Sequence, residues 1–122
     1  MTRLQVGLAA LGLAMAAAGP FAQEQAPNRR EFTITARDYR FVPDRIEVSQ
    51  DDLVKITFRS EERPHSFVID AYRIVKRAGG GQTVTFEFRA DQAGTFSFYC
   101  NLTSDPGCRD MQGTLTVKAR PR

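Results

Sequence analysis

Apolar and polar residues alternate with a period of two over most of the chain beyond residue 30. This alternation is typical of β-strands that bury one face, and the runs are short, with no long helical period between them. Turn-forming residues such as Gly79-Gly80-Gly81 and Asp105-Pro106-Gly107 separate the runs. The runs lie at 32–36, 46–48, 54–58, 84–88, 96–98 and 115–117. The pattern predicts an all-β sandwich or barrel of six to eight strands, with 72–78 left open between a short helix, an extra strand and a loop.

The chain begins with a different pattern, an almost unbroken apolar stretch from Leu4 to Gly19 behind the positive charge of Arg3. A positive start, a short Ala-rich apolar run and a processing point after Ala22 are typical of a secretory signal peptide. We therefore expect a signal peptide at 1–22, a flexible lead-in at 23–30 and one domain at 31–122. This organisation predicts a bacterial protein that is periplasmic or secreted. A retained N-terminal anchor helix is the alternative.

Length and charge narrow the range of partners. The 122 residues carry 17 basic and 14 acidic side chains, for a formal charge of +3. The basic residues are scattered among acidic ones, which is too weak a pattern for a nucleic-acid interface. The roughly 100 residues that follow the signal peptide are enough for one compact domain. We expect a monomer with no nucleic-acid partner and no membrane span after signal cleavage.

Unusual chemistry is concentrated between residues 98 and 117, which contain both cysteines and the last methionine. Cys100 ends one strand-like run, an Asp-Pro-Gly loop and Cys108 follow, and Met111 stands just before the next run. Soft sulfur ligands suit copper(I), and with imidazole they can hold copper in both oxidation states. The chain's single histidine, His65, follows Pro64 at the start of another strand-like run. Because exported domains usually oxidise a pair of thiols, a disulfide competes with metal ligation here.

Several motifs carry a family resemblance across nearly the whole domain. They are Phe41-Val-Pro43, Pro-His65-Ser-Phe-Val-Ile, Gly-Gly-Gln-Thr-Val-Thr-Phe, and Ala-Gly-Thr-Phe-Ser-Phe-Tyr-Cys100 leading to Met111-Gln-Gly113. The part of the chain that contains these motifs resembles a cupredoxin, the Greek-key β-sandwich of blue copper proteins and of subunit II of cytochrome c oxidase. The resemblance implies that fold here. It also implies that His65 is the first imidazole ligand of a copper ion, Cys100 the thiolate and Met111 the axial thioether.

Two positions depart from the family's ligand loop. The oxidase-like loop has a second Cys four residues after the first, where this chain has Ser104. It has a His eight residues after the first Cys, where this chain has Cys108. Without a second bridging thiolate, a dinuclear copper centre is not expected. Without a second imidazole, neither is an ordinary blue copper site.

Three interpretations of the loop remain. In the first, which is our main hypothesis, His65, Cys100, Cys108 and Met111 bind a single copper ion. This site would favour copper(I) and serve copper handling or electron transfer, with a redox or copper-transfer protein as partner. In the second, a Cys100–Cys108 disulfide closes a copper-free binding module. In the third, the pair cycles as a dithiol redox partner, although its spacing lacks the Cys-x-x-Cys geometry. With one His and no recognisable base and orienting group, we do not expect an enzyme.

Overall fold

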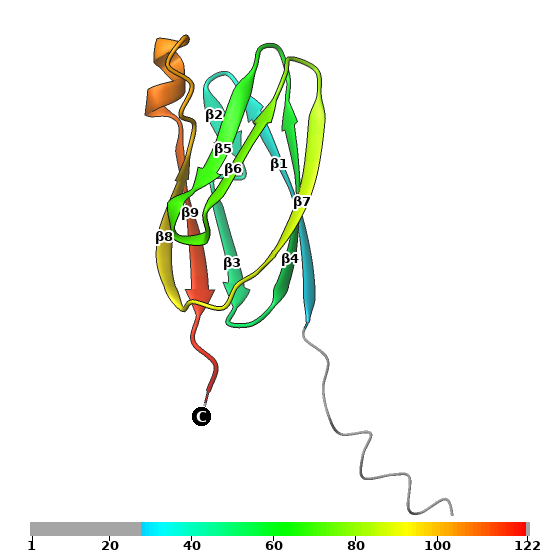
Figure 1. The fold of residues 1–122 in the computed structure, drawn as a ribbon, viewed down its shortest axis with the longest axis vertical. Helices are drawn as coiled ribbons and strands as arrows, with labels where there is room; N and C mark the ends of the chain where they lie inside the picture. The colour runs from blue at the N-terminus through cyan, green and yellow to red at the C-terminus, as the bar shows by residue number, and fades with distance from the viewer. Residues whose placement is uncertain (1–27, 122) are drawn as a thin grey trace, which may run out of the picture.

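The computed structural model of the protein describes residues 28–121, and the predicted signal peptide at 1–22 lies outside them. The described chain forms two β-sheets packed face to face, so the expected all-β sandwich is confirmed (Figure 1). Nine strands and two short 3-10 helices make up these residues. They are β1 (Arg29–Arg37), β2 (Arg40–Val42), β3 (Arg45–Ser49), β4 (Leu53–Ser60), β5 (His65–Ile69), η2 (Asp70–Tyr72), β6 (Ile74–Ala78), β7 (Thr83–Arg89), β8 (Gly94–Tyr99), η3 (Pro106–Asp110) and β9 (Gln112–Lys118).

Each sheet combines antiparallel neighbours with one parallel pair. The four-stranded sheet has the order β2-β1-β4-β7, and the five-stranded sheet has the order β3-β9-β8-β5-β6. β1 is parallel to β4, and β3 is parallel to β9. The register places apolar residues opposite each other, for example Ile34 opposite Phe58 and Val48 opposite Val117. Because side chains alternate between faces along a strand, this register turns the period-two pattern into one continuous core.

Phenylalanines from both sheets fill the centre of that core. Phe67 on β5 stacks on Phe98 of β8, with ring centroids 4.8 Å apart. Its ring also approaches those of Phe41, Phe58 and Phe86 on the opposite sheet at 5.9, 5.6 and 5.7 Å. Offset and edge-on pairs at these separations add to the stabilisation that comes from burying the apolar area. The core therefore joins the two sheets directly beneath the strand that begins with His65.

The segment that the sequence left open, 72–78, is now defined. Tyr72 ends η2, Arg73 adopts a left-handed conformation with φ 55°, and Ile74–Ala78 form β6 as the partner of β5. This edge strand and the three-residue β2 bring the number of strands to nine, above the expected six to eight. Short strands and edge strands carry a weak alternation signal, because few of their residues face the core.

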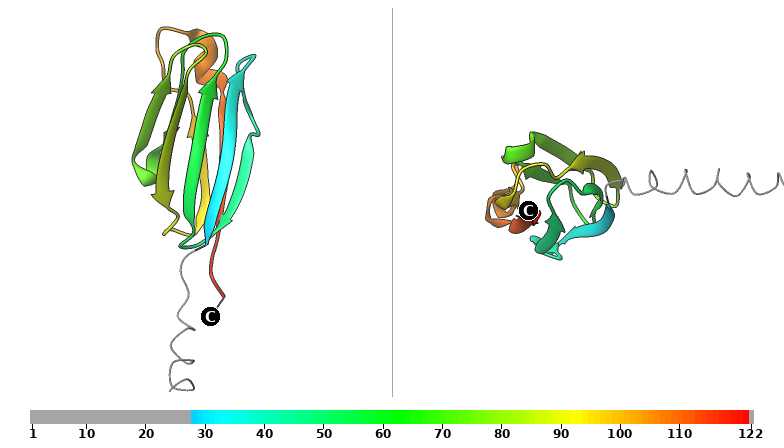
Figure 2. Two further views of the ribbon diagram at one scale, coloured as in Figure 1. Left: turned by 90° about the vertical axis from the view of Figure 1, so that its right-hand side faces the viewer. Right: turned by 90° about the horizontal axis from the view of Figure 1, so that it is seen from below.

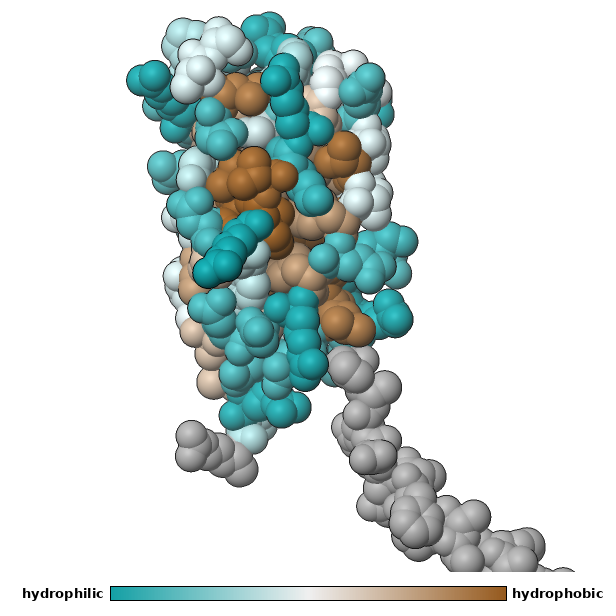
Figure 3. Space-filling model, in the orientation of Figure 1, coloured by the Kyte–Doolittle hydropathy of each residue, from teal (hydrophilic) through white to brown (hydrophobic). Residues whose placement is uncertain are grey.

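The two ends of the sandwich differ. The 3-10 helix η3 and the loop that contains it lie at one end, and the end of β9 and the start of β1 lie at the other (Figures 1 and 2). Most of the face drawn in Figure 3 is hydrophilic, with an apolar area over β5 and β6. Within residues 28–121, no helix is long and apolar enough to cross a membrane.

Candidate metal centre

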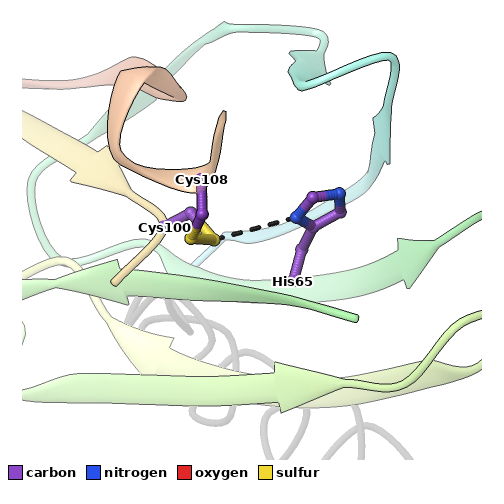
Figure 4. Close-up of side chains that lie close together, drawn as sticks. All are labelled: His65, Cys100 and Cys108. Carbon is purple, nitrogen blue, oxygen red and sulfur yellow. Dashed lines mark hydrogen bonds between the residues drawn. A yellow bond between two sulfur atoms is a disulfide. The ribbon is translucent and has the colours of Figure 1, made fainter. Parts of the chain in front are cut away.

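His65 is held in the interior at the η3 end of the sandwich. It is the first residue of β5 and is 2% exposed. Pro64 precedes it and restricts the backbone, so the strand and its hydrogen-bond ladder start at the histidine. The ring Nδ1 lies 3.8 Å from the Sγ atom of Cys100, and both point into the same space (Figure 4). The imidazole is therefore directed at the sulfur pair and away from solvent.

Cys100 and Cys108 form a disulfide, with their sulfur atoms 1.95 Å apart. Cys100 directly follows β8, Cys108 lies in η3, and both are buried. Each sulfur also accepts a backbone hydrogen bond. The N–H of Ser66 donates to Sγ of Cys100 at 3.3 Å, and the N–H of Leu102 donates to Sγ of Cys108 at 3.0 Å. The two sulfurs thus have separate donors on different segments of the chain.

Backbone hydrogen bonds bring Met111 beside both cysteines. Met111 follows η3, is 1% exposed, and donates its N–H to the carbonyl of Cys108 at 3.1 Å. Its own carbonyl accepts a hydrogen bond from the N–H of Cys100 at 3.4 Å. Asp105 caps η3 by accepting from the N–H of Gly107, and Pro106 occupies the first turn. The Asp-Pro-Gly motif therefore builds the short helix that places Cys108 and Met111 on one buried end of the core.

Tyr39 supports this arrangement from the other sheet. It lies in the two-residue turn between β1 and β2, where Asp38 and Tyr39 have φ of 49° and 57°. Its ring packs edge-on against His65 with centroids 5.7 Å apart, and its hydroxyl donates to Asp105 at 3.2 Å. Arg63 lies over the same ring and donates to the hydroxyl. Tyr39 thereby connects the histidine to the loop that contains the cysteines.

The surroundings of His65 favour its neutral form. Burial lowers the pKa of His65 below its ordinary value, the Asp105 carboxylate opposes this shift, and the Arg63 guanidinium adds to it. A neutral imidazole is the form that binds metals. Outside the ring lies a small cavity of about 80 Å³, bordered by Tyr39, Glu62 and Arg63.

The donor set matches a soft metal in chemistry and in spacing. Potential ligand atoms of His65, Cys100 and Cys108 all lie within 4.8 Å of one another. Metal–donor bonds of about 2.0–2.3 Å place two donors of a tetrahedral ion roughly 3.3–3.8 Å apart. The 3.8 Å between His65 Nδ1 and Cys100 Sγ fits that spacing. The two sulfurs, which are bonded to each other, do not have that spacing.

The structure thus brings together all four residues chosen from the sequence, His65, Cys100, Cys108 and Met111. The sequence left two partners open for Cys108, a metal ion and the sulfur of Cys100. In the structure Cys108 is bonded to Cys100. Ser104, in the same loop, is exposed.

Sequence reasoning missed the residues that support the site. The Ser66 hydroxyl accepts from the N–H of Asn101 and donates to its side chain, both at 2.7 Å, which ties β5 to the ligand loop. Position 66, next to the only histidine, gave a weak signal for this role. Tyr39 gave none, because its contacts link residues 66 positions apart.

The pattern of the cupredoxin-like domain matches residues 7–117, and the chain belongs to this family. No protein of curated function matches the sequence significantly. The expected cupredoxin-like sandwich is confirmed by solved structures, all below 25% identity, which therefore establish the fold alone.

Three of these solved structures are similar to this chain as follows. Auracyanin A, a blue copper protein from Chloroflexus aurantiacus, is 19% identical with a TM-score of 0.64, over 75% of this chain and 100% of its own. The metal-binding domain of a Cu(I)-exporting P-type ATPase from Streptococcus pneumoniae, solved with Cu(I), is 16% identical with a TM-score of 0.64, over 77% and 90%. Blue copper oxidase from Nitrosomonas europaea is 20% identical with a TM-score of 0.67, over 78% of this chain and 40% of its own.

Proposed function

We propose that this protein binds one copper ion in its reduced form, through His65, Cys100, Cys108 and Met111. Two thiolates, one imidazole and one thioether are a soft donor set that favours copper(I) over copper(II). The observation that carries the proposal is the convergence of the buried imidazole of His65 on the buried sulfur pair, with 3.8 Å between its Nδ1 and the Sγ of Cys100. A disulfide that served only as a staple would need no histidine directed at it.

The role that fits this donor set is copper handling, or electron transfer if the bound ion also cycles. Support comes from the described relatives, which include a blue copper protein and a Cu(I)-binding domain of an exporter. With two thiolates the site holds copper(I) more firmly than a site with one, which suits capture and transfer better than rapid redox cycling. A copper-transfer or redox protein would be the partner. The apolar stretch at 4–19 supports export to the periplasm or beyond.

This role is binding and not catalysis. The chain is one small cupredoxin-like domain, whereas the blue copper oxidase above is more than twice as long as the part it shares with this chain. Within residues 28–121, the site has one imidazole, and its two sulfurs are joined in the disulfide. A nucleophilic mechanism would need a free nucleophile together with a base and an orienting group.

A copper(I) titration tests the proposal. The reduced protein, kept free of oxygen, is titrated against a competing copper(I) chelator, and thiols are counted before and after. We expect one copper ion per chain. His65→Ala should weaken the affinity by more than about tenfold, the loss typical even of a residue that only supports a ligand. Ser104→Ala, an exposed change in the same loop, is the matched control and should bind like the natural protein. Binding no tighter than that of the unfolded chain would exclude the proposal.

A second candidate function follows from the disulfide itself. If Cys100 and Cys108 stay bonded throughout the protein's life, the chain is a copper-free interaction module of the same fold. A thiol count on the protein as isolated from its native compartment separates the two, because a permanent disulfide leaves neither Cys100 nor Cys108 free to bind copper(I).

A further inference from the structure

We propose that the Cys100–Cys108 bond is a switch that determines whether the site binds copper. The inference rests on the proposed function and concerns the control of the same site. Two of the four proposed ligands are the two atoms of the disulfide, so the oxidised protein has two donors left, His65 and Met111. The copper-binding state and the disulfide state therefore exclude each other.

The two sulfurs have hydrogen-bond donors that would serve both the disulfide and the reduced form. The N–H groups of Ser66 and Leu102 each donate to a different sulfur, Ser66 from β5 and Leu102 from the loop between the two cysteines. Ser66 lies in β5, and its hydroxyl is bonded to Asn101. Hydrogen bonds to sulfur stabilise a thiolate, which is the form of cysteine that binds metal. Reduction would thus leave each thiolate with its own donor.

Burial makes the switch selective. Cys100 is 2% exposed and Cys108 is 0% exposed, so a large oxidant or reductant has no direct approach to either sulfur. The two are held 5.2 Å apart at their Cα atoms by β8 and η3, inside the range in which a disulfide can close without backbone movement. A bond between them forms faster than a mixed disulfide with a bulky outside thiol. The expected products are the internal disulfide and the dithiol.

The dithiol and disulfide states interconvert by exchange with a small dithiol or by reaction with copper(II). A small dithiol reduces the protein by exchange: its two thiols become a disulfide, and Cys100 and Cys108 each gain a hydrogen. Copper(I) then binds to both sulfurs and releases two protons. In the opposite direction, two copper(II) ions accept one electron each from the dithiol, which yields two copper(I) ions, the disulfide and two protons.

By thermodynamic linkage, the disulfide and bound copper(I) must affect each other to the same extent. If the disulfide weakens copper(I) binding, bound copper(I) must oppose formation of the disulfide by the same factor. The copper-loaded protein is therefore expected to keep its thiols in a disulfide buffer that oxidises the metal-free protein.

The test compares two preparations of the same protein, one fully reduced and one fully oxidised, with folding checked by circular dichroism and thiols counted. Both are titrated with copper(I) against a competing chelator. We expect the oxidised form to bind at least about 100-fold more weakly, since two donors are lost, and binding to return after treatment with a small dithiol. Equal affinity of the two forms would overturn the switch while leaving the copper function intact. Failure of the reduced form to bind copper(I) would contradict both the switch and the proposed copper function.

Cys108→Ser provides the matched variant, because it keeps His65, Cys100 and Met111 but cannot form the disulfide. Its copper(I) affinity is expected to be the same before and after exposure to a disulfide buffer. A loss of affinity in this variant equal to that of the natural protein would show that oxidation acts elsewhere. If the variant does not fold, the natural protein is used instead. Protection of its thiols by copper(I) against a disulfide buffer would support the switch, and no protection would contradict it.

Discussion

At the scale of single residues, the proposed metal chemistry depends on Cys108. By the resemblance to the oxidase-like loop it stands where that loop has a histidine, and its buried side chain reaches Cys100 from η3. One imidazole and two sulfurs favour copper(I), whereas two imidazoles around one thiolate form a blue copper site. The rest of the scaffold already places His65, Cys100 and Met111 together.

Replacement of Cys108 by histidine should therefore convert the site. Cys108→His removes the disulfide and supplies a second imidazole from the same buried position. We expect the variant to bind copper(II) and to show the intense visible absorption of a blue copper site, which the natural protein should lack.

Ser104→His is the control for this conversion, because it adds a histidine to the same loop at an exposed position. It should remain colourless with copper(II). Strong blue absorption in both variants, or in neither when Cys108→His is folded, would contradict the assignment of position 108.

At the scale of elements, the contact between η3 and the β1–β2 turn holds the ligand loop against His65. Gly107 permits it, because a Cβ atom at this position would lie 2.4 Å from the ring of Tyr39. The ring in turn contacts His65, and its hydroxyl is bonded to Asp105. These contacts join three segments that are distant in sequence.

Gly107→Ala is expected to separate η3 from Tyr39. Overpacking of this kind costs about 1–3 kcal/mol in the free energy of unfolding, measured with a denaturant. Copper(I) affinity of the reduced variant should fall by about tenfold or more, as for other changes to groups that support metal ligands. Gly79→Ala is the matched control, because its new Cβ would meet the flexible end of the Gln82 side chain. Unchanged affinity in Gly107→Ala would show that this contact does not position the site.

How much the sequence predicts also depends on scale. The alternation of residues 32–36, 54–58 and 84–88 predicted strands that the structure confirms, because each of these strands buries one face. β6 was ambiguous, because as an edge strand it buries few residues. The four proposed ligands were found through their spacing and the family resemblance. Tyr39 was not, because its role comes from tertiary contacts that leave no local pattern.

At the scale of the whole molecule, one aromatic core supports the site from beneath. Phe67 belongs to the same strand as His65 and contacts phenylalanines of both sheets. The ends of the described chain emerge away from the site, so tags or fusions there leave it free (Figure 1). The position of His65 therefore depends on the packing of the sandwich as a whole.

Truncation of Phe67 should weaken the entire fold. Phe67→Ala is expected to lower the free energy of unfolding by about 3–5 kcal/mol, because it leaves a cavity between the sheets. Val75→Ala, on β6, removes a side chain that is 63% exposed and should change stability by no more than about 0.5 kcal/mol. Denaturant titration followed by circular dichroism measures both. Similar small losses in the two variants would contradict a single shared core.

The central claim, that this cupredoxin-like domain holds copper through sulfur and its one histidine, is tested most directly by X-ray absorption at the copper edge of the reduced, copper-loaded protein. We expect copper(I) surrounded mainly by sulfur together with a single imidazole, and loss of the imidazole signal in His65→Ala. A first shell of oxygen and nitrogen without sulfur, or an unchanged spectrum in His65→Ala, would contradict it.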